Sequence, residues 1–198
     1  SSNSYFMKDH ANVSNGQLVL TVDEAANEAS PSRAYTGGGV NTAAWANHGQ
    51  VYGKWEVEAQ FPTGFGVTGY IGLFSTDKVW PPEVDFAEMI GREPTKLYLT
   101  QHYGTSEATE KSGSVIDSST LDLSAWADTF HIYSIEWTPE GLKYFVDGAL
   151  VLNQTAHFDP SEMDVAVGTG TGDCGSFVDC PENAETNGFR HPLPATML

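Results

Sequence analysis

The sequence predicts an all-β protein. Of its 198 residues, 12% are aromatic, 20 are glycine and 10 are proline, and windows rich in helix-forming residues are few. This composition is typical of many short strands joined by turns. The length fits one domain, residues 1–198, in which roughly 70% of the unfolded chain's surface can be buried on folding.

Alternation of apolar and polar residues marks the first strands. In residues 50–61 the apolar side chains fall on one face and the charged ones on the other, which is the pattern of a half-buried strand. Residues 68–75 are almost continuously apolar and predict a more deeply buried strand. A β-branched run over residues 17–22 follows the turn signal Asn15-Gly16 and predicts a further strand.

The second half of the chain predicts a meander of three strands that ends near residue 152. Residues 131–138 and 142–146 are separated by a short turn, and Asp147-Gly148 is the strongest hairpin signal in the chain. Residues 168–187 are glycine-rich and polar and predict a long surface loop. Earlier, Gly37-Gly38-Gly39 predicts either a tight bend or a close approach of the backbone to another group.

Three carboxylates lie within the six residues Glu83-Val84-Asp85-Phe86-Ala87-Glu88. Strand periodicity puts Glu83 and Asp85 on one face but leaves Glu88 on the opposite parity. One extra residue, a β-bulge at Phe86-Ala87, would return Glu88 to the face of the other two acids, and such bulges are frequent beside active sites. The alternative is a solvated strand in a chain that has 26 acidic residues.

Two neighbouring segments favour a cleft at this strand. Pro81 and Pro82 exclude ladder hydrogen bonds and hold Trp80 at the mouth of the strand, where its ring could stack on a sugar or pack in the core. Residues 97–103 alternate, with Thr100 and His102 on the polar face. If this strand pairs with the acidic one, His102 faces the same cleft.

The charge balance narrows the class of partner. With 9 basic and 26 acidic residues the net charge is -17, which repels nucleic acid and anionic membranes and favours a neutral or cationic partner. An adaptation to high salt is an alternative explanation of this charge. No apolar run approaches the roughly 18 residues of a membrane span, and Ser1-Ser2-Asn3-Ser4 has no signal-peptide pattern, so we expect a mature or trimmed chain.

Cys174 and Cys180 are the two cysteines of the chain. They enclose five residues, and no histidine lies beside them, so a disulfide is favoured over a metal site. A disulfide favours an oxidising compartment. We therefore expect a secreted protein.

Six stretches, read together, resemble glycoside hydrolase family sixteen, the β-jelly-roll enzymes that include laminarinases, lichenases, agarases and carrageenases. They run in family order and are residues 12–22 (NVSNGQLVLTV), 35–42 (YTGGGVNT), 52–58 (YGKWEVE), 80–88 (WPPEVDFAE), 131–139 (HIYSIEWTP) and 144–148 (YFVDG). The pattern E-x-D-x-x-E is the most specific and resembles the bulged form of laminarinases and agarases. The resemblance implies a concanavalin-like sandwich of two curved antiparallel sheets with a concave substrate cleft.

Carried over residue by residue, the resemblance implies Glu83 as nucleophile, Glu88 as general acid/base and Asp85 as the residue between them that steers charge and protonation. A retaining glycosidase uses two carboxyl groups about 5 Å apart, one ionised and one protonated. Crowding three acids onto one face keeps a proton on one of them near neutral pH. The chemistry therefore agrees with the implied roles.

The resemblance also implies that Glu56 faces the sugar and that Trp80 and His102 lie beside the cleavage point. We further expect Asn41 and Thr100 to bind the substrate. The chain departs from the family in two places. Residues 70–73 (YIGL) replace a run that often carries a tryptophan, and the segment after residue 167 lacks another tryptophan. One aromatic platform is therefore missing or supplied elsewhere.

The family normally continues past the position of residues 194–198 into one last strand. Without that strand, we expect a sheet to present an exposed edge. Family members often carry a structural calcium ion on the convex side, whose ligands this sequence does not reveal. No cofactor is implied for catalysis.

These observations together predict an endo-acting, retaining enzyme that hydrolyses a neutral polysaccharide, most like β-1,3- or β-1,3-1,4-glucan, and acts as a monomer. The alternatives are a galactan hydrolase of agarase type, a transglycosylase with the same residues, and a non-catalytic carbohydrate-binding protein on the same fold. The last alternative is disfavoured because a lectin gains nothing from burying three acids.

Overall fold

The computed structural model describes all residues except 1–3, 25–32, 45–47, 128, 189–192 and 194. Its regular elements are strands and short 3₁₀ helices. The 3₁₀ helices are η1 (Lys8–His10), η2 (Thr42–Ala44), η3 (Ser118–Leu121), η4 (Pro181–Asn183) and η5 (Glu185–Asn187). Within the described part of the chain, no helix is both long and apolar enough to cross a membrane.

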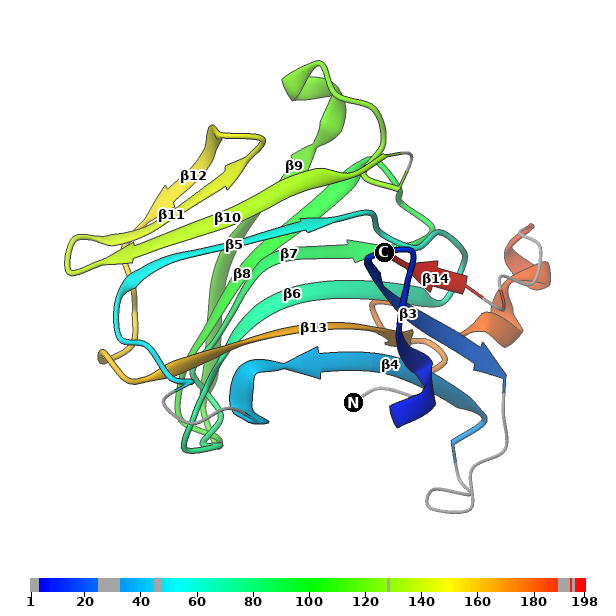
Figure 1. The fold of residues 1–198 in the computed structure, drawn as a ribbon, viewed down its shortest axis with the longest axis horizontal. Helices are drawn as coiled ribbons and strands as arrows, with labels where there is room; N and C mark the ends of the chain where they lie inside the picture. The colour runs from blue at the N-terminus through cyan, green and yellow to red at the C-terminus, as the bar shows by residue number, and fades with distance from the viewer. Residues whose placement is uncertain (1–3, 25–32, 45–47, 128, 189–192, 194) are drawn as a thin grey trace.

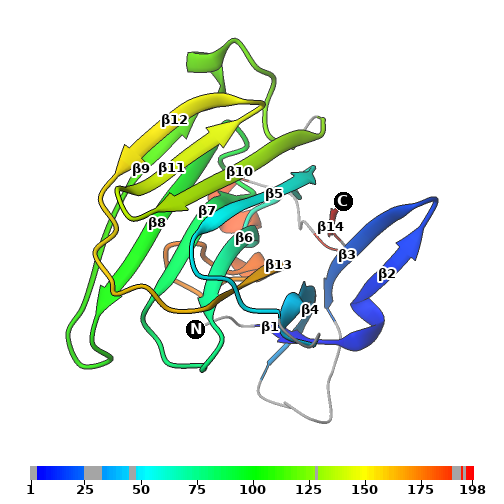
Figure 2. The ribbon, with the colours of Figure 1, turned by 60° about the vertical axis from the view of Figure 1, so that its left-hand side comes forward.

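The strands form two sheets that stack face to face and bend together (Figures 1 and 2). The ten-stranded sheet has β14-β3-β4-β13-β6-β7-β8-β9 in spatial order, with β1 on β4 and β2 on β3. Its strands are β1 (Ser4–Phe6), β2 (Ala11–Ser14), β3 (Gln17–Glu24), β4 (Tyr35–Asn41), β6 (Val67–Ser75), β7 (Glu83–Ile90), β8 (Lys96–Gly104), β9 (Thr109–Asp117), β13 (Met163–Thr171) and β14 (Ala195–Met197).

The four-stranded sheet has the spatial order β12-β11-β10-β5. Its strands are β5 (Gly53–Ala59), β10 (His131–Thr138), β11 (Gly141–Val146) and β12 (Ala149–Gln154). All strand pairs are antiparallel except β1 with β4. The predicted all-β sandwich and the predicted meander over β10, β11 and β12 are both confirmed. Asp147 and Gly148 have φ angles of 48° and 79°, as a two-residue type I′ turn requires.

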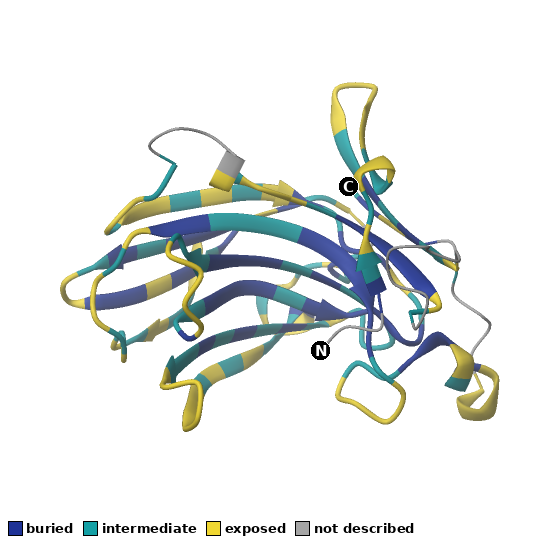
Figure 3. Cartoon of the chain, turned by 90° about the horizontal axis from the view of Figure 1, so that it is seen from below, coloured by how far each residue is buried: buried dark blue, intermediate teal, exposed yellow. Residues whose placement is uncertain are grey.

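The hydrophobic core lies between the two sheets, because one face of each contributes fully buried side chains. The ten-stranded sheet supplies Ile71, Leu73 and Leu99 among others, and the four-stranded sheet supplies Ile135 and Tyr144. Figure 3 shows buried stretches along the middle of the strands and exposed residues at the turns. The opposite face of the ten-stranded sheet is not covered by the four-stranded sheet, so polar side chains can gather there.

Several boundaries differ from the sequence prediction. The three glycines of residues 37–39 do not form a bend but lie inside β4. The predicted close approach of the backbone is correct, since a Cβ added at Gly38 would lie 2.1 Å from the carbonyl oxygen of His10. β13 is longer than its predicted core of residues 165–167, and β9 was not predicted because its sequence is polar and lacks alternation. Residues 25–32 of the predicted loop lie outside the described residues.

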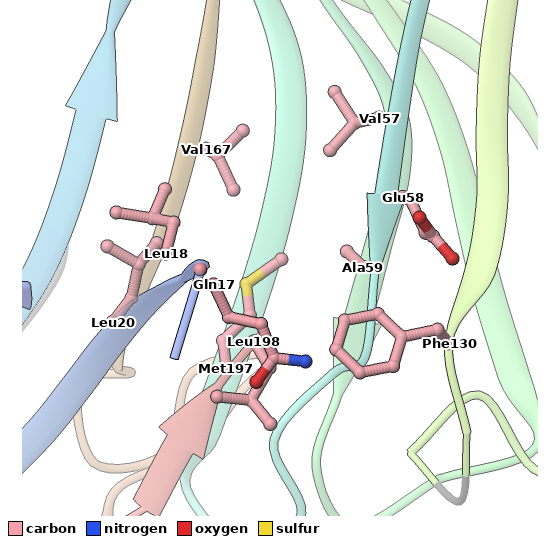
Figure 4. A pocket seen from close by; sticks show the side chains of 11 residues that line it. Gln17, Leu18, Leu20, Val57, Glu58, Ala59, Phe130, Val167, Met197 and Leu198 are labelled. Carbon is pink, nitrogen blue, oxygen red and sulfur yellow. The ribbon is translucent and has the colours of Figure 1, made fainter. Parts of the chain in front are cut away.

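The C-terminal residues close one side of the sandwich. β14 pairs with β3, and Leu198 exchanges two backbone hydrogen bonds with Gln60, at 2.7 and 3.0 Å, just beyond the end of β5. Farther along, β3 and β5 separate around an apolar pocket of about 290 Å³ (Figure 4). Its walls include Leu18, Val57 and Phe130.

The position of the core can be tested with two isoleucines of β10. Ile135 is fully buried between the sheets, whereas Ile132 is 39% exposed on the outer face of the same strand. We expect Ile135→Ala to lower the free energy of unfolding by about 2–5 kcal/mol and Ile132→Ala by about 0.5 kcal/mol, measured by urea denaturation. Equal losses in the two variants would contradict the proposed packing of the sheets.

Candidate active site

A β-bulge in β7 brings the three acids to one face of the ten-stranded sheet. Asp85 pairs with Thr100 and Glu88 with Tyr98. The distance along the strand from Asp85 to Glu88 therefore takes three residues on β7 but only two on β8. The same shift occurs against β6 between Ile71 and Gly72. Phe86 and Ala87 are both buried in the core, whereas Asp85 and Glu88 on either side line a cleft. The predicted bulge and the predicted shared face of Glu88 and Glu83 are thus present.

The cleft lies on the uncovered face of the ten-stranded sheet and has a volume of about 460 Å³. Cross-strand partners in an antiparallel sheet share a face, so the register defines rows of side chains across this cleft. Glu83 pairs with His102, Asp85 with Thr100, and Glu88 with Tyr98. We call this surface the acid face, defined by the row positions of Glu83, Asp85 and Glu88.

Trp80 lies at the mouth of the cleft, as its position before the two prolines predicted. Its indole Nε1–H donates a hydrogen bond of 2.5 Å to Oε2 of Glu83. An indole N–H is only a donor, so the carboxyl oxygen of Glu83 accepts this bond. The ring is 46% exposed and lies 5.9 Å from the ring of His102, so part of its apolar face remains open to a ligand.

His102 and Asp85 form a pair in the centre of the cleft. Nε2 of His102 lies 3.6 Å from Oδ2 of Asp85, whose carboxyl is almost completely buried. The close contact with the carboxylate of Asp85, with the charge of Glu83, raises the pKa of His102 above its ordinary value. The pairing of β8 with β7, on which the predicted position of His102 depended, is present in the structure.

Burial raises the pKa of the carboxyl groups of Asp85 and Glu88 to about 7. For Asp85 the negative charge of Glu83 adds to this rise, while the close contact with His102 opposes it. For Glu88 the negative charge of Asp85 adds to the rise, while His102 and Lys111 oppose it. Since three neighbouring acids cannot all ionise without a large cost, one proton remains on Asp85 or Glu88 near neutral pH.

Thr100 and Asn41 lie in the same row as Asp85. Asn41 pairs with Ala166, Ala166 with Gly72, and Gly72 with Asp85. Three strand spacings separate β4 from β7, so Asn41 lies about 14 Å from the acids across the sheet. A Cβ added at Gly72 would lie 3.0 Å from Oδ1 of Asp85, so glycine leaves this carboxyl room.

The structure does not bring Glu56 to the cleft of the three acids, although it was expected to face the sugar. Glu56 belongs to β5 of the four-stranded sheet, where its neighbours Trp55 and Val57 face the core. Its exposed carboxylate points to the outer face and lies 2.8 Å from Nζ of Lys54. The acids belong to the other sheet, so strand order separates Glu56 from them.

Five further residues line the cleft that the sequence analysis did not select: Tyr70, Phe74, Tyr98, Lys111 and Phe177. The period of two in β6 could have indicated the first two, since Tyr70, Gly72 and Phe74 share a face. Tyr98 shares the face of Thr100 for the same reason. Lys111 comes from the unpredicted strand β9, and Phe177 from a loop, where periodicity carries no signal.

The cysteines form the predicted disulfide, with Cys174 and Cys180 joined by an S–S bond of 2.04 Å. Among the described residues, they and Glu182 form the one group of three potential metal ligands. Calcium prefers six to eight oxygen ligands, and two disulfide sulfurs with one carboxylate do not meet this need. This group therefore does not match a calcium site.

The fold and the row of carboxyl groups in its cleft define the jelly-roll class of glycoside hydrolases. The model of the family described as "Glycosyl hydrolases family 16" matches residues 1–175. The chain belongs to this family, as the resemblance of its six stretches predicted.

Two bacterial relatives show the extent of the similarity. The chain is 31% identical over 157 residues to "Endo-1,3-1,4-beta-glycanase ExsH" of Rhizobium meliloti (strain 1021), a match that covers 76% of this chain and 31% of the relative. It is 31% identical over 156 residues to "Beta-glucanase" of Rhodothermus marinus, covering 72% of this chain and 49% of the relative. The matched part thus spans between about a third and a half of these curated relatives.

Solved structures agree on the fold. The laminarinase catalytic domain of Thermotoga maritima MSB8 superposes with a TM-score of 0.79 at 24% identity, covering 99% of this chain and 80% of that domain. The endo-β-1,3-glucanase of Pyrococcus furiosus superposes with a TM-score of 0.77 at 20% identity, covering 99% and 77%. The predicted sandwich of two antiparallel sheets is therefore confirmed.

The raised pKa values predict how stability depends on pH. The pKa of Glu88 is about 7 in the folded protein against an ordinary value of 4.5, so the folded state binds the proton more tightly. The stability that this protonated carboxyl contributes is full below pH 4.5 and is lost as pH rises through about 7. We expect Glu88→Gln to gain stability relative to the parent protein between pH 4.5 and 8, measured by urea denaturation.

A carboxyl whose pKa is shifted the other way provides the control. Hydrogen bonds from Thr138 and the backbone lower the pKa of the exposed Glu140. Glu140→Gln is therefore expected to show no gain over the same pH range. A pH-independent difference between Glu88→Gln and the parent protein would contradict the raised pKa of Glu88.

Proposed function

We propose that the protein is an endo-acting, retaining glycoside hydrolase that cleaves internal β-linkages of a neutral glucan with β-1,3 or mixed β-1,3-1,4 linkages. The observation that carries the proposal is the row of Glu83, Asp85 and Glu88 on one face, produced by the bulge in β7. Two features support the substrate class: relatives named as a β-glucanase and an endo-1,3-1,4-β-glycanase, and a net charge of -17 that suits an uncharged polymer.

In this proposal Glu83 is the nucleophile. Its Oε2 accepts the hydrogen bond from Trp80, which orients the carboxylate and leaves Oε1 to attack the anomeric carbon. The bond from the anomeric carbon to the leaving oxygen breaks as the new ester bond forms. A covalent glycosyl-enzyme is the product of this first step.

Glu88 is the general acid and then the general base. Because its pKa is raised to about 7, Glu88 is still partly protonated at neutral pH, and the protonated form donates its proton to the leaving oxygen. In the second step it accepts a proton from the water that attacks the ester, and Glu83 is released. No cofactor takes part in these two steps.

Asp85 and His102 lie beside Glu83 and Glu88 and influence the charges in the cleft. While Glu83 is ionised, its charge raises the pKa of Asp85. Ester formation removes that charge, so the pKa of Asp85 falls and Asp85 ionises more readily.

The nucleophile assignment can be tested with one substitution. We expect Glu83→Gln to lower kcat on laminarin by roughly 10³-fold or more, because an amide cannot form the ester, while the fold is retained. Reducing-end assays on laminarin, barley β-glucan, agarose and carrageenan identify the glycan. Glu58→Gln, an exposed glutamate of β5, is the matched control and should keep full activity. Cleavage by Glu83→Gln at the parent rate would refute the assignment.

The stereochemical outcome is a separate test. Two successive displacements at the anomeric carbon return its original configuration. We expect proton NMR of the first minutes of hydrolysis to show the β-anomer as the initial product, followed by slow mutarotation. An initial α-anomer would indicate an inverting enzyme and would exclude Glu83 as a covalent nucleophile.

Secretion and a monomeric state stay proposals that rest on the sequence and the family resemblance. The disulfide supports an oxidising compartment. Size-exclusion chromatography with light scattering measures the oligomeric state directly.

A further inference from the structure

One exposed aromatic residue in the cleft has no role in the chemistry proposed above. Phe177 lines the same cleft as Glu88 and Tyr98, and 55% of its surface is exposed to solvent. It lies in the disulfide loop, which we define as residues 172–180. An aromatic ring kept in water at the rim of an acidic cleft retains apolar area that a ligand can cover.

The ring of Phe177 is held in a defined orientation. It contacts Tyr98 edge to face, with the ring centroids 5.0 Å apart and the planes at 89°. Tyr98 is itself fixed, because its hydroxyl donates a 2.5 Å hydrogen bond to Glu93. Since Tyr98 pairs with Glu88 across the strands, Phe177 lies beside the row of Glu88 and Tyr98.

The backbone of the disulfide loop is also anchored to the body of the sheet. The guanidinium of Arg92 donates hydrogen bonds of 2.8 Å to the carbonyl oxygen of Phe177 and 2.6 Å to that of Val178. Inside the loop, Oδ1 of Asp179 accepts hydrogen bonds from the backbone N–H groups of Gly175 and Cys180. The disulfide closes the same loop. These contacts reduce the conformational freedom that ligand binding would otherwise have to remove.

We propose that Phe177 is a sugar-binding platform, on which one hexopyranose ring of the substrate stacks beside the row of Glu88 and Tyr98, and that Arg92 is its positioning residue. The C–H groups of one pyranose face are apolar and carry partial positive charge, which matches the negative face of an aromatic ring. The platform deepens the proposed function and rests on it for the class of ligand, a neutral glucan.

The experiment measures binding apart from cleavage. In the Glu83→Gln background, titration calorimetry with β-1,3-gluco-oligosaccharides of two to six units gives Kd for each length. We expect Phe177→Ala to weaken binding about tenfold for the longer oligosaccharides, the scale of one aromatic contact and its buried area. Phe177→Trp should bind at least as tightly as the parent. Leu150→Ala, an equally exposed apolar residue of β12, is the control and should leave Kd unchanged.

The role of Arg92 is tested by a double-mutant cycle on the same Kd. Arg92→Gln alone should weaken binding, whereas Arg92→Gln added to Phe177→Ala should weaken it no further, because the residue acts through the ring. A merely structural role would give additive losses. Thermal unfolding of each variant verifies that the fold persists.

The outcomes separate the platform from the proposed function. If the parent protein cleaves glucan and Phe177→Ala leaves both Kd and KM unchanged, the platform is refuted while the proposed function stands. If the parent protein cleaves no glucan but binds the oligosaccharides in a Phe177-dependent way, the platform stands and hydrolysis is refuted. Absence of both cleavage and binding refutes both.

Discussion

One extra residue in β7 is the constraint on which the whole site depends. A regular strand would direct Glu88 toward the core, where Phe86 and Ala87 now lie. The bulge places two consecutive residues on the core side and thereby keeps Asp85 and Glu88 in the cleft. Because both neighbouring strands show the corresponding shift in register, the distortion is built into the centre of the sheet and not into a free edge.

The same arrangement accounts for the electrostatics of the cleft. The acids lie on the face of β7 opposite the core. The apolar packing that stabilises the sandwich therefore also shields Asp85 and Glu88 from water. Desolvation is the largest cause of their raised pKa values, and the mutual charges of the acids add to it. His102 limits the effect from the neighbouring strand. Stability and proton affinity are therefore coupled through one strand.

The walls of the cleft come from segments that are far apart in the chain. Trp80 precedes β7, whereas Phe177 follows β13 by six residues and reaches the cleft because Arg92 and the disulfide hold its loop. The segment after residue 167 lacks the tryptophan common in the family, yet it supplies an aromatic ring from another position. In the floor beside the acids, Gly72 leaves space next to Asp85.

Local patterns in the sequence determined much of this protein: the strand periods of β5, β6 and β8, the turn at Asp147-Gly148, and the odd spacing of Glu88, which demanded a bulge. These features depend on neighbours within a few residues, so they can be recognised without a fold. Only the tertiary structure decided that Glu56 faces away from the acids, that Asn41 shares a row with Asp85, and that Lys111 and Phe177 enter the cleft. Those positions follow from strand order and loop anchoring, which no local period encodes.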